Sequence, residues 1–246
     1  MFEKLGVYKV SEAKAIRSYI ETLDEGKIFT CKELPFNPQS VTVELCKLAK
    51  MGTIQKASKG RYYKPRLTQF GASKPKDDEI IKSYTENQKS GYVSGVALYN
   101  SFGLTTQVPS KIEIKSNRVA PLKQKTKNLT IEFSPSKVKI STANVPLLKL
   151  LDLLKYINKA PDVSIEAVLT TVKQEILKLE NSKQKKLISL AKEYPPKVRA
   201  LLGALLQSMG KWDFAFTLKE TLNPLSSYKL NIDASILPNK EKWRIL

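Results

Sequence analysis

Residues 29–65, FTCKELPFNPQSVTVELCKLAKMGTIQKASKGRYYKP, decide the fold of the N-terminal part of this chain. Thr30 and Glu33 have the spacing of a capping box, in which a hydroxyl and a carboxylate each bond a free backbone N–H. Pro35 removes a backbone donor and disfavours helical geometry at the residue before it. The stretch therefore predicts a short helix that begins at Thr30 and ends before Pro35.

A second helix is predicted directly after it. Asn37 supplies an N-cap side chain, and Pro38 fits the first helical position, where its missing N–H costs nothing. Apolar residues then recur at helical spacing and predict a face packed on the core: Val41, Leu45 and Leu48. The opposite face holds polar, small apolar and cationic side chains suited to base edges and phosphates: Gln39, Ser40, Thr42, Val43, Lys47 and Lys50.

A hairpin is predicted after this helix, which Gly52 ends as a left-handed cap. Its strands are Thr53–Ala57 and Arg61–Lys64, and Gly60 supplies the positive φ that a short turn needs. Upstream, Ser11–Leu23 carries an apolar face and predicts a first helix. The order of helix, short helix, helix and hairpin is typical of a winged helix-turn-helix, which binds duplex DNA with one helix and one β-ribbon.

We therefore predict an α+β protein with two domains: a winged helix-turn-helix over residues 1–76, with a linker at about 66–78, and a second domain over 77–246. Polar and cationic groups beside each other suit both phosphate anchoring and groove reading. The expected DNA-binding residues are Lys32, Asn37, Gln39, Ser40, Thr42, Val43, Lys47, Lys56, Lys59 and Arg61. The alternative is a winged helix that serves only in packing or dimerisation.

The charge of the chain agrees with an anionic partner. The formal net charge is +19, and cations outnumber anions in each of the stretches 1–76, 77–138 and 139–246. Nucleic acid is the commonest partner of such a chain. Lysine supplies most of the cations, and it is weaker than arginine in bidentate recognition of guanine.

Catalytic and metal-binding motifs are scarce. The chain has no histidine, the commonest general base, and no glycine-rich phosphate loop. Cys31 and Cys46 lack metal-ligand spacing, and Cys46 is expected to be buried or half-buried. We expect no catalytic residue, no metal, no cofactor and no enzyme. With no signal peptide or membrane span, we expect a cytoplasmic protein.

The second domain is predicted to combine a small antiparallel sheet with a helical C-terminal region. Ser94 is expected to cap a helix that runs to Phe102. The expected strands are Lys111–Ser116, Leu129–Phe133 and Lys137–Ser141. The expected helices are Ile80–Asn87, Pro146–Ile157, Ser164–Leu179, Ser182–Glu193 and Pro195–Met209, and Ser226–Asp233 is expected to be a further strand.

Several motifs, in order along nearly the whole chain, resemble those of the AbiEi-type antitoxins, in an uncharacterised branch of that family. The wing KGRYYKP precedes GYVSGVALYNSFGLTTQVPSKIEIKSN at 91–117. Later segments agree: NVPLLKLLDLLKYINKAPD at 144–162, PPKVRALLGALLQSMG at 195–210 and ETLNPLSSYKL at 220–230.

The resemblance implies that the winged helix binds the chain's own promoter, as a transcriptional autorepressor. It also implies a C-terminal antitoxin domain that opposes a nucleotidyltransferase toxin, without obligatory direct contact, in a toxin–antitoxin system for phage defence. Two other functions stay open. The basic C-terminal domain could bind a partner protein or RNA, with the winged helix as a scaffold, or carboxylates and lysines could form a metal-dependent nucleic-acid enzyme.

Overall fold

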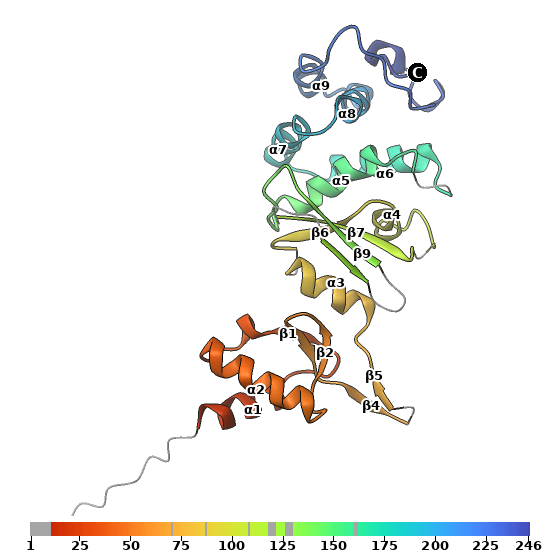
Figure 1. The fold of residues 1–246 in the computed structure, drawn as a ribbon. Helices are drawn as coiled ribbons and strands as arrows, with labels where there is room; N and C mark the ends of the chain where they lie inside the picture. The colour runs from red at the N-terminus through yellow and green to blue at the C-terminus, as the bar shows by residue number, and fades with distance from the viewer. Residues whose placement is uncertain are drawn as a thin grey trace, which may run out of the picture. The chain divides into compact units, whose positions relative to one another are not determined.

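The computed structural model describes residues 11–69, 71–86, 88–107, 109–117, 122–125, 130–159 and 162–246. The chain is an α+β protein, and its contacts divide it into two compact units (Figure 1). Unit 1 is Met1–Tyr84 and unit 2 is Thr85–Leu246. Residues 77–84, which the sequence assigned to the second domain, thus belong to the first unit.

Unit 1 contains three helices, a 3-10 helix and two small sheets among its described residues. Strand β3 lies between β1 and β2 in an antiparallel sheet, and β4 and β5 pair as a separate ribbon. In chain order the elements are α1 (Glu12–Glu21), β1 (Ile28–Thr30), η1 (Cys31–Glu33), α2 (Pro38–Lys50), β2 (Gln55–Ser58), β3 (Arg61–Tyr63), β4 (Arg66–Thr68), β5 (Gly71–Ser73) and α3 (Asp77–Thr85).

Capping residues and an apolar core explain the two long helices of unit 1. The Ser11 side chain accepts a hydrogen bond from the Lys14 N–H at the start of α1, and Asn37 accepts one from the Gln39 N–H at the start of α2. Both helices were predicted. Their apolar faces meet the sheet in one core: Ile16, Ile20, Phe29, Leu34, Val41, Leu45, Leu48, Ile54 and Tyr62.

The predicted capping box at Thr30 is wrong. The Thr30 hydroxyl donates to the Glu33 carboxylate at 3.2 Å and caps no backbone N–H. Thr30 lies at the end of β1, where it pairs with Arg61, and Leu34 before Pro35 is extended. Only three residues remain between them, so they form a 3-10 helix and not an α-helix.

The predicted linker at 66–78 contains regular structure. It holds the β4–β5 ribbon, whose turn includes Gly71 with a φ of +99°, and the first residues of α3. The carboxylate run Asp77–Glu79 forms the first turn of α3, where negative side chains stabilise the helix dipole.

Unit 2 begins with a four-stranded sheet of β6 (Gly91–Ser94), β7 (Lys111–Ser116), β8 (Leu122–Lys125) and β9 (Thr130–Pro135). The strand order is β6-β7-β9-β8. Strands β7 and β9 run parallel, so the prediction of an antiparallel sheet is wrong for its central pair. The outer strands are antiparallel to their neighbours.

Two other predictions fail at the margins of this sheet. Residues 137–141 form no strand, because the Asn117 side chain bonds both the N–H and the carbonyl of Ile140, at 2.8 and 3.0 Å. These are the groups that a neighbouring strand would otherwise engage. Ser94 caps no helix either: it ends β6, and α4 (Ala97–Ser101) begins after Gly95, whose φ is +70°.

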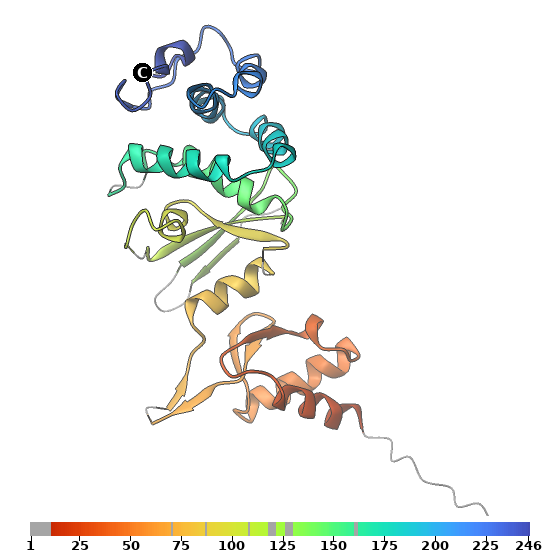
Figure 2. The ribbon, with the colours of Figure 1, turned by 180° about the vertical axis from the view of Figure 1, so that it is seen from behind.

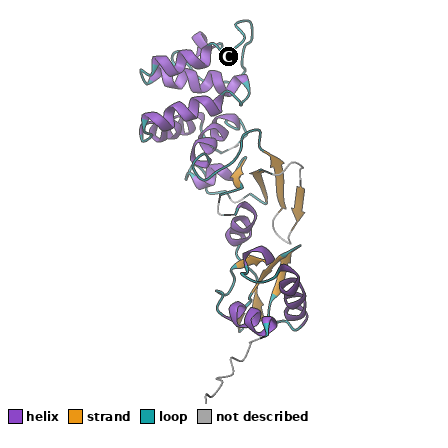
Figure 3. Cartoon of the chain, turned by 90° about the vertical axis from the view of Figure 1, so that its left-hand side faces the viewer, coloured by secondary structure: helices purple, strands orange, loops and turns teal. Residues whose placement is uncertain are grey.

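Helices make up most of the rest of unit 2 (Figures 2 and 3). Helix α5 contacts β6, α4 and three later helices, and α8 packs against α9 and η2. The elements are α5 (Val145–Lys155), α6 (Ile165–Leu177), α7 (Asn181–Ala191), α8 (Pro196–Ser208), α9 (Trp212–Lys219) and η2 (Lys240–Trp243). The first four match predicted helices, whereas α9 was not predicted.

The predicted strand at Ser226–Asp233 is also wrong. This segment makes only an isolated bridge between Tyr228 and Ile245, and Asn231 interrupts it with a φ of +52°. Leu230 and Ile232 are nevertheless buried in the core of unit 2. In the described part of the chain, no helix has the length and apolar character that crossing a membrane requires.

Candidate nucleic-acid interface

Helix α2 presents one buried and one exposed face. Val41, Leu45 and Leu48 are buried, as the sequence predicted. The opposite side chains are exposed, including that of Val43, whose exposed fraction is 54%. The exposed residues of this face are Gln39, Thr42, Val43, Cys46, Lys47 and Lys50. Cys46 was expected to be buried or half-buried, and that expectation is wrong.

Polar groups at the start of α2 are occupied within the protein. Glu12 of α1 accepts from the Asn37 N–H at 3.0 Å and from the Ser40 hydroxyl at 2.7 Å. These bonds hold the pKa of the Glu12 carboxyl below its usual range, the Ser40 hydroxyl having the larger effect. The Thr42 hydroxyl donates to the Pro38 carbonyl at 2.7 Å. Asn37, Ser40 and Thr42 thus fix the helix, and Gln39, Val43 and Lys47 are better placed to reach a ligand.

A buried carboxylate fixes α2 against α1. The Glu44 side chain is 2% exposed and accepts from the Arg17 Nε at 2.5 Å, with the Lys47 Nζ at 3.8 Å. A buried carboxylate that is hydrogen-bonded to a guanidinium resists rearrangement, since separating the pair would leave a charge without compensation. The exposed face of α2 is therefore held in a fixed orientation within unit 1.

The β2–β3 hairpin lies beside this face. Tyr62 of β3 is buried, and burial raises the pKa of its hydroxyl, with smaller contributions from the neighbouring Cys46 and Cys31 thiols. Lys56 of β2 lies over the same ring, with its Nζ 5.9 Å from the ring centroid. Cys46, Tyr62 and Lys56 thus connect the exposed face of α2 to the hairpin. We call the exposed side chains of Gln39, Val43, Cys46, Lys47, Lys56 and Lys59 the α2–hairpin surface.

Two of the three predicted cations of the hairpin are exposed. Lys56 and Lys59 point to solvent, and Gly60 makes the turn with a φ of +72°. Lys32 of η1 is also exposed. Arg61 differs: its guanidinium lies 3.8 Å from the Tyr84 ring centroid and donates to the Ser83 carbonyl at 3.3 Å. Arg61 is half-buried against α3, which corrects its prediction as a phosphate contact.

We expect Arg61→Ala to destabilise unit 1 and to leave the salt dependence of DNA binding unchanged. The variant loses a cation–π contact and a charged hydrogen bond, together worth about 1–3 kcal/mol. The Tyr84 hydroxyl bonds the Ser58 hydroxyl at 2.8 Å, so part of the attachment of α3 remains. Urea unfolding and binding titrations at several salt concentrations measure the two quantities. A reduced salt slope with unchanged stability would contradict this assignment.

The β4–β5 ribbon is a feature that the sequence reading missed. Arg66, Leu67 and Thr68 are exposed, and the exposed fraction of Leu67 is 80%. The Thr68 hydroxyl donates to the Gly71 carbonyl at 2.8 Å and braces the turn. The short spacing between Thr68 and Gly71 was the available signal, but three-residue strands are too brief to show alternation. Figure 1 shows the ribbon extending away from the sheet of unit 1.

Metal chemistry finds no support at this surface. Among the residues that the structure describes, no group of three His, Cys, Asp or Glu side chains could hold a metal ion. The cavity of unit 1, of about 140 Å³, lies between Tyr19, Phe29 and Leu34 and not at the α2–hairpin surface. The surface is therefore suited to contact a large ligand from outside.

Comparisons with known proteins give one family and one structural likeness. A family model described as a family of unknown function (DUF6088) matches residues 15–184. No curated protein matches the chain. The crystal structure of the RV2827C protein from Mycobacterium tuberculosis is similar over 94% of this chain and 89% of that chain, with 12% sequence identity and a TM-score of 0.46.

Proposed function

The chain belongs to the DUF6088 family, whose function is unknown, and from its own residues we propose that unit 1 is a winged helix-turn-helix that binds double-stranded DNA. In this proposal α2 is the recognition helix and the β2–β3 hairpin is the wing. The observation that carries it is the α2–hairpin surface, where an uncharged polar helix face adjoins two exposed lysines through Cys46 and Tyr62.

Physical chemistry assigns different roles to the residues of this surface. A recognition helix lies in the major groove, where side chains meet base edges. Gln39 can bond adenine through its amide, and Val43 can contact the thymine methyl group. Lys47, Lys56 and Lys59 would neutralise phosphates, and such contacts position the protein without reading the sequence. Asn37, Ser40 and Thr42 hold α2 in place.

The double helix that we propose as the ligand is the chain's own promoter, so that the protein is a transcriptional autorepressor. The antitoxin function, against a nucleotidyltransferase toxin and without obligatory contact with it, rests on the sequence resemblance alone. Co-expression tests it: the chain should restore growth to cells that express a nucleotidyltransferase encoded by a neighbouring gene. Continued growth arrest at full expression of the chain would remove the antitoxin proposal and leave DNA binding unaffected.

Gln39→Ala should lower the preference for the promoter over unrelated DNA while leaving non-specific binding nearly unchanged. A bidentate amide–adenine contact discriminates between bases by about 1–3 kcal/mol, or roughly tenfold to a hundredfold. Gln39 is exposed, so the variant should keep its stability. Competition titrations with promoter and scrambled duplexes measure the ratio. Lys50→Ala, on the same helix, is the matched control and should keep that ratio. Equal loss on both duplexes after Gln39→Ala would contradict the role of Gln39.

A second candidate function has its own observation. Lys183, Lys185 and Lys186 are exposed along α7 in unit 2, where they could bind RNA or an acidic partner. Alanine substitutions at Lys185 and Lys186 separate the two proposals. If they abolish nucleic-acid binding while substitutions in the α2–hairpin surface do not, unit 1 is a scaffold.

A further inference from the structure

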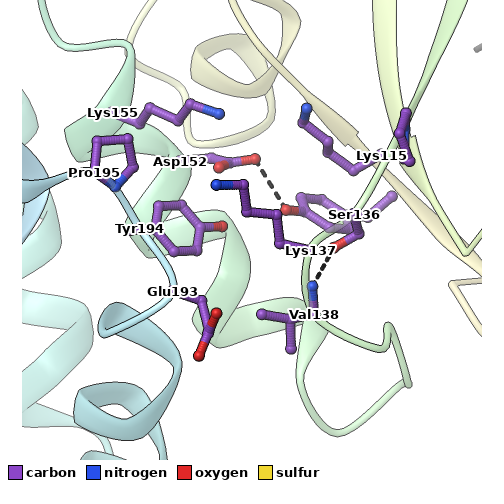
Figure 4. Close-up of a pocket in the computed structure, with 11 residues that line it drawn as sticks. Lys115, Ser136, Lys137, Val138, Asp152, Lys155, Glu193, Tyr194 and Pro195 are labelled. Carbon is purple, nitrogen blue, oxygen red and sulfur yellow. Dashed lines mark hydrogen bonds between the residues drawn. The ribbon is translucent and has the colours of Figure 1, made fainter.

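We propose that unit 2 binds a phosphate or phosphate monoester dianion in a small pocket where Lys115, Lys137 and Lys155 converge beside Asp152. The pocket has a volume of about 150 Å³ and lies between β7, the segment after β9, α5 and the α7–α8 loop. Figure 4 shows the three lysine side chains reaching it from different elements. This site is separate from the α2–hairpin surface and does not depend on DNA binding.

The wall of the pocket contains a carboxylate that is almost fully buried. Asp152 is 1% exposed, and its Oδ2 accepts from the Tyr92 hydroxyl at 2.9 Å and the Ser94 hydroxyl at 2.5 Å. Burial, followed by the charge of Asp152, raises the pKa values of the Tyr92 and Tyr194 hydroxyls. Both phenols are therefore neutral at physiological pH and can donate hydrogen bonds.

The lysines exceed what Asp152 and the second acidic residue, Glu193, can neutralise. In the described part of the chain, no ammonium group of the three lies within 4.0 Å of a carboxylate oxygen. The Lys155 ammonium instead lies 5.1 Å from the centroid of the Tyr156 ring and 6.0 Å from that of Tyr194. Three cations against two anions leave the pocket positively charged.

The environment of Lys115 indicates that this positive charge lacks compensation. Its pKa is lowered, first by burial and then by repulsion from Lys155, and the attraction of Asp152 and Glu113 does not reverse the shift. If the lysines served only to neutralise Asp152, the attraction would dominate and the pKa would rise. A bound dianion between Lys115 and Lys155 would supply the missing negative charge.

The chemistry of the donors favours a phosphoryl group. Lysine ammonium groups bind phosphate oxygens as point charges, and hydroxyl groups add neutral donors. The ring of Pro135 and the ring of Pro195 line the same hollow and limit its width. Its volume suits a single phosphoryl group with a small substituent. Such a group could come from a free metabolite or from the 5′ end of a nucleic acid.

Calorimetric titration of the full chain tests the proposal at constant ionic strength. The probes are inorganic phosphate, adenosine monophosphate and a short oligonucleotide with or without a 5′-phosphate. Saturable binding of a phosphate-bearing probe is expected, with affinity weakened at least about tenfold in Lys115→Met and in Lys155→Met. Lys111→Met is the matched control, because Lys111 is exposed on the same strand and pairs with Glu132 outside the pocket. That variant should bind as the native chain does.

The probes also distinguish the sources of the phosphoryl group. Binding of phosphate and adenosine monophosphate identifies a free metabolite, whereas binding of the 5′-phosphorylated oligonucleotide alone identifies a nucleic-acid end. Without phosphate, Lys115→Met should raise the thermal midpoint, because it removes a cation that the pocket destabilises. The proposal is overturned if no probe saturates, if Lys111→Met weakens binding equally, or if Lys115→Met lowers the midpoint.

Discussion

The Lys56→Ala/Lys59→Ala variant is expected to bind promoter DNA roughly a hundredfold more weakly than the native chain, since each charged contact to phosphate contributes about 1.5 kcal/mol or more. Both side chains are exposed on the proposed wing, so their removal should not change the stability of unit 1. Phosphate contacts carry no sequence information, and binding to promoter and to unrelated duplexes should weaken alike. Fluorescence anisotropy with labelled duplexes measures both affinities.

Salt dependence provides an independent measure of the same contacts. Each phosphate contact contributes about 0.9 to the slope of log affinity against log salt, so losing two should reduce the slope by about 1.8. The Lys185→Ala/Lys186→Ala variant removes the same charge from α7 and is the matched control, with an unchanged slope expected. An unchanged slope in the hairpin variant, or an equal change in both, would show that the hairpin is not the wing.

Gly203→Ala is expected to destabilise unit 2 by about 1–3 kcal/mol, the usual cost of overpacking a core. Gly203 is buried in α8, and a Cβ there would lie 2.2 Å from Cζ3 of Trp243. The Trp243 ring is 3% exposed, and its Nε1 donates to the Gln207 side chain at 2.6 Å. The ring therefore cannot move aside freely. The higher helix propensity of alanine, worth about 1 kcal/mol, offsets only part of this cost.

A double-mutant comparison isolates the steric cause of this effect. Trp243→Leu leaves space next to Gly203, so adding Gly203→Ala in that background should cost much less than in the native chain. Urea unfolding gives the free energies for all four chains. Equal costs in the two backgrounds would mean that contact with Trp243 does not explain the glycine.

Local signals in the sequence predicted the helices of unit 1 well. Ser11 and Asn37 cap α1 and α2 because each cap needs only an acceptor and an N–H two or three residues away. The same reasoning failed at Thr30, because pairing with Arg61 extends β1 to that residue. A distant strand thus determined where the helix could begin.

Non-local features could not be predicted from periodicity. Alternation indicates a strand but not the direction of its partner, so the parallel pairing of β7 with β9 was missed. Arg61 was assigned to phosphate because it is next to Lys59, whereas Tyr84 lies far along the chain and its ring covers the guanidinium. The Asp152 pocket was missed for the same reason, since its residues come from distant segments.

The exposed thiol of Cys46 allows the most direct test of the proposed DNA interface. Cys46 lies on the α2–hairpin surface, while Cys31 is half-buried and serves as an internal reference. With saturating promoter duplex, alkylation of Cys46 by a maleimide should slow at least about tenfold, because DNA in contact with α2 covers the thiol. The rate at Cys31 should change much less. An unchanged rate at Cys46, measured with fully bound DNA, would contradict recognition of DNA by α2.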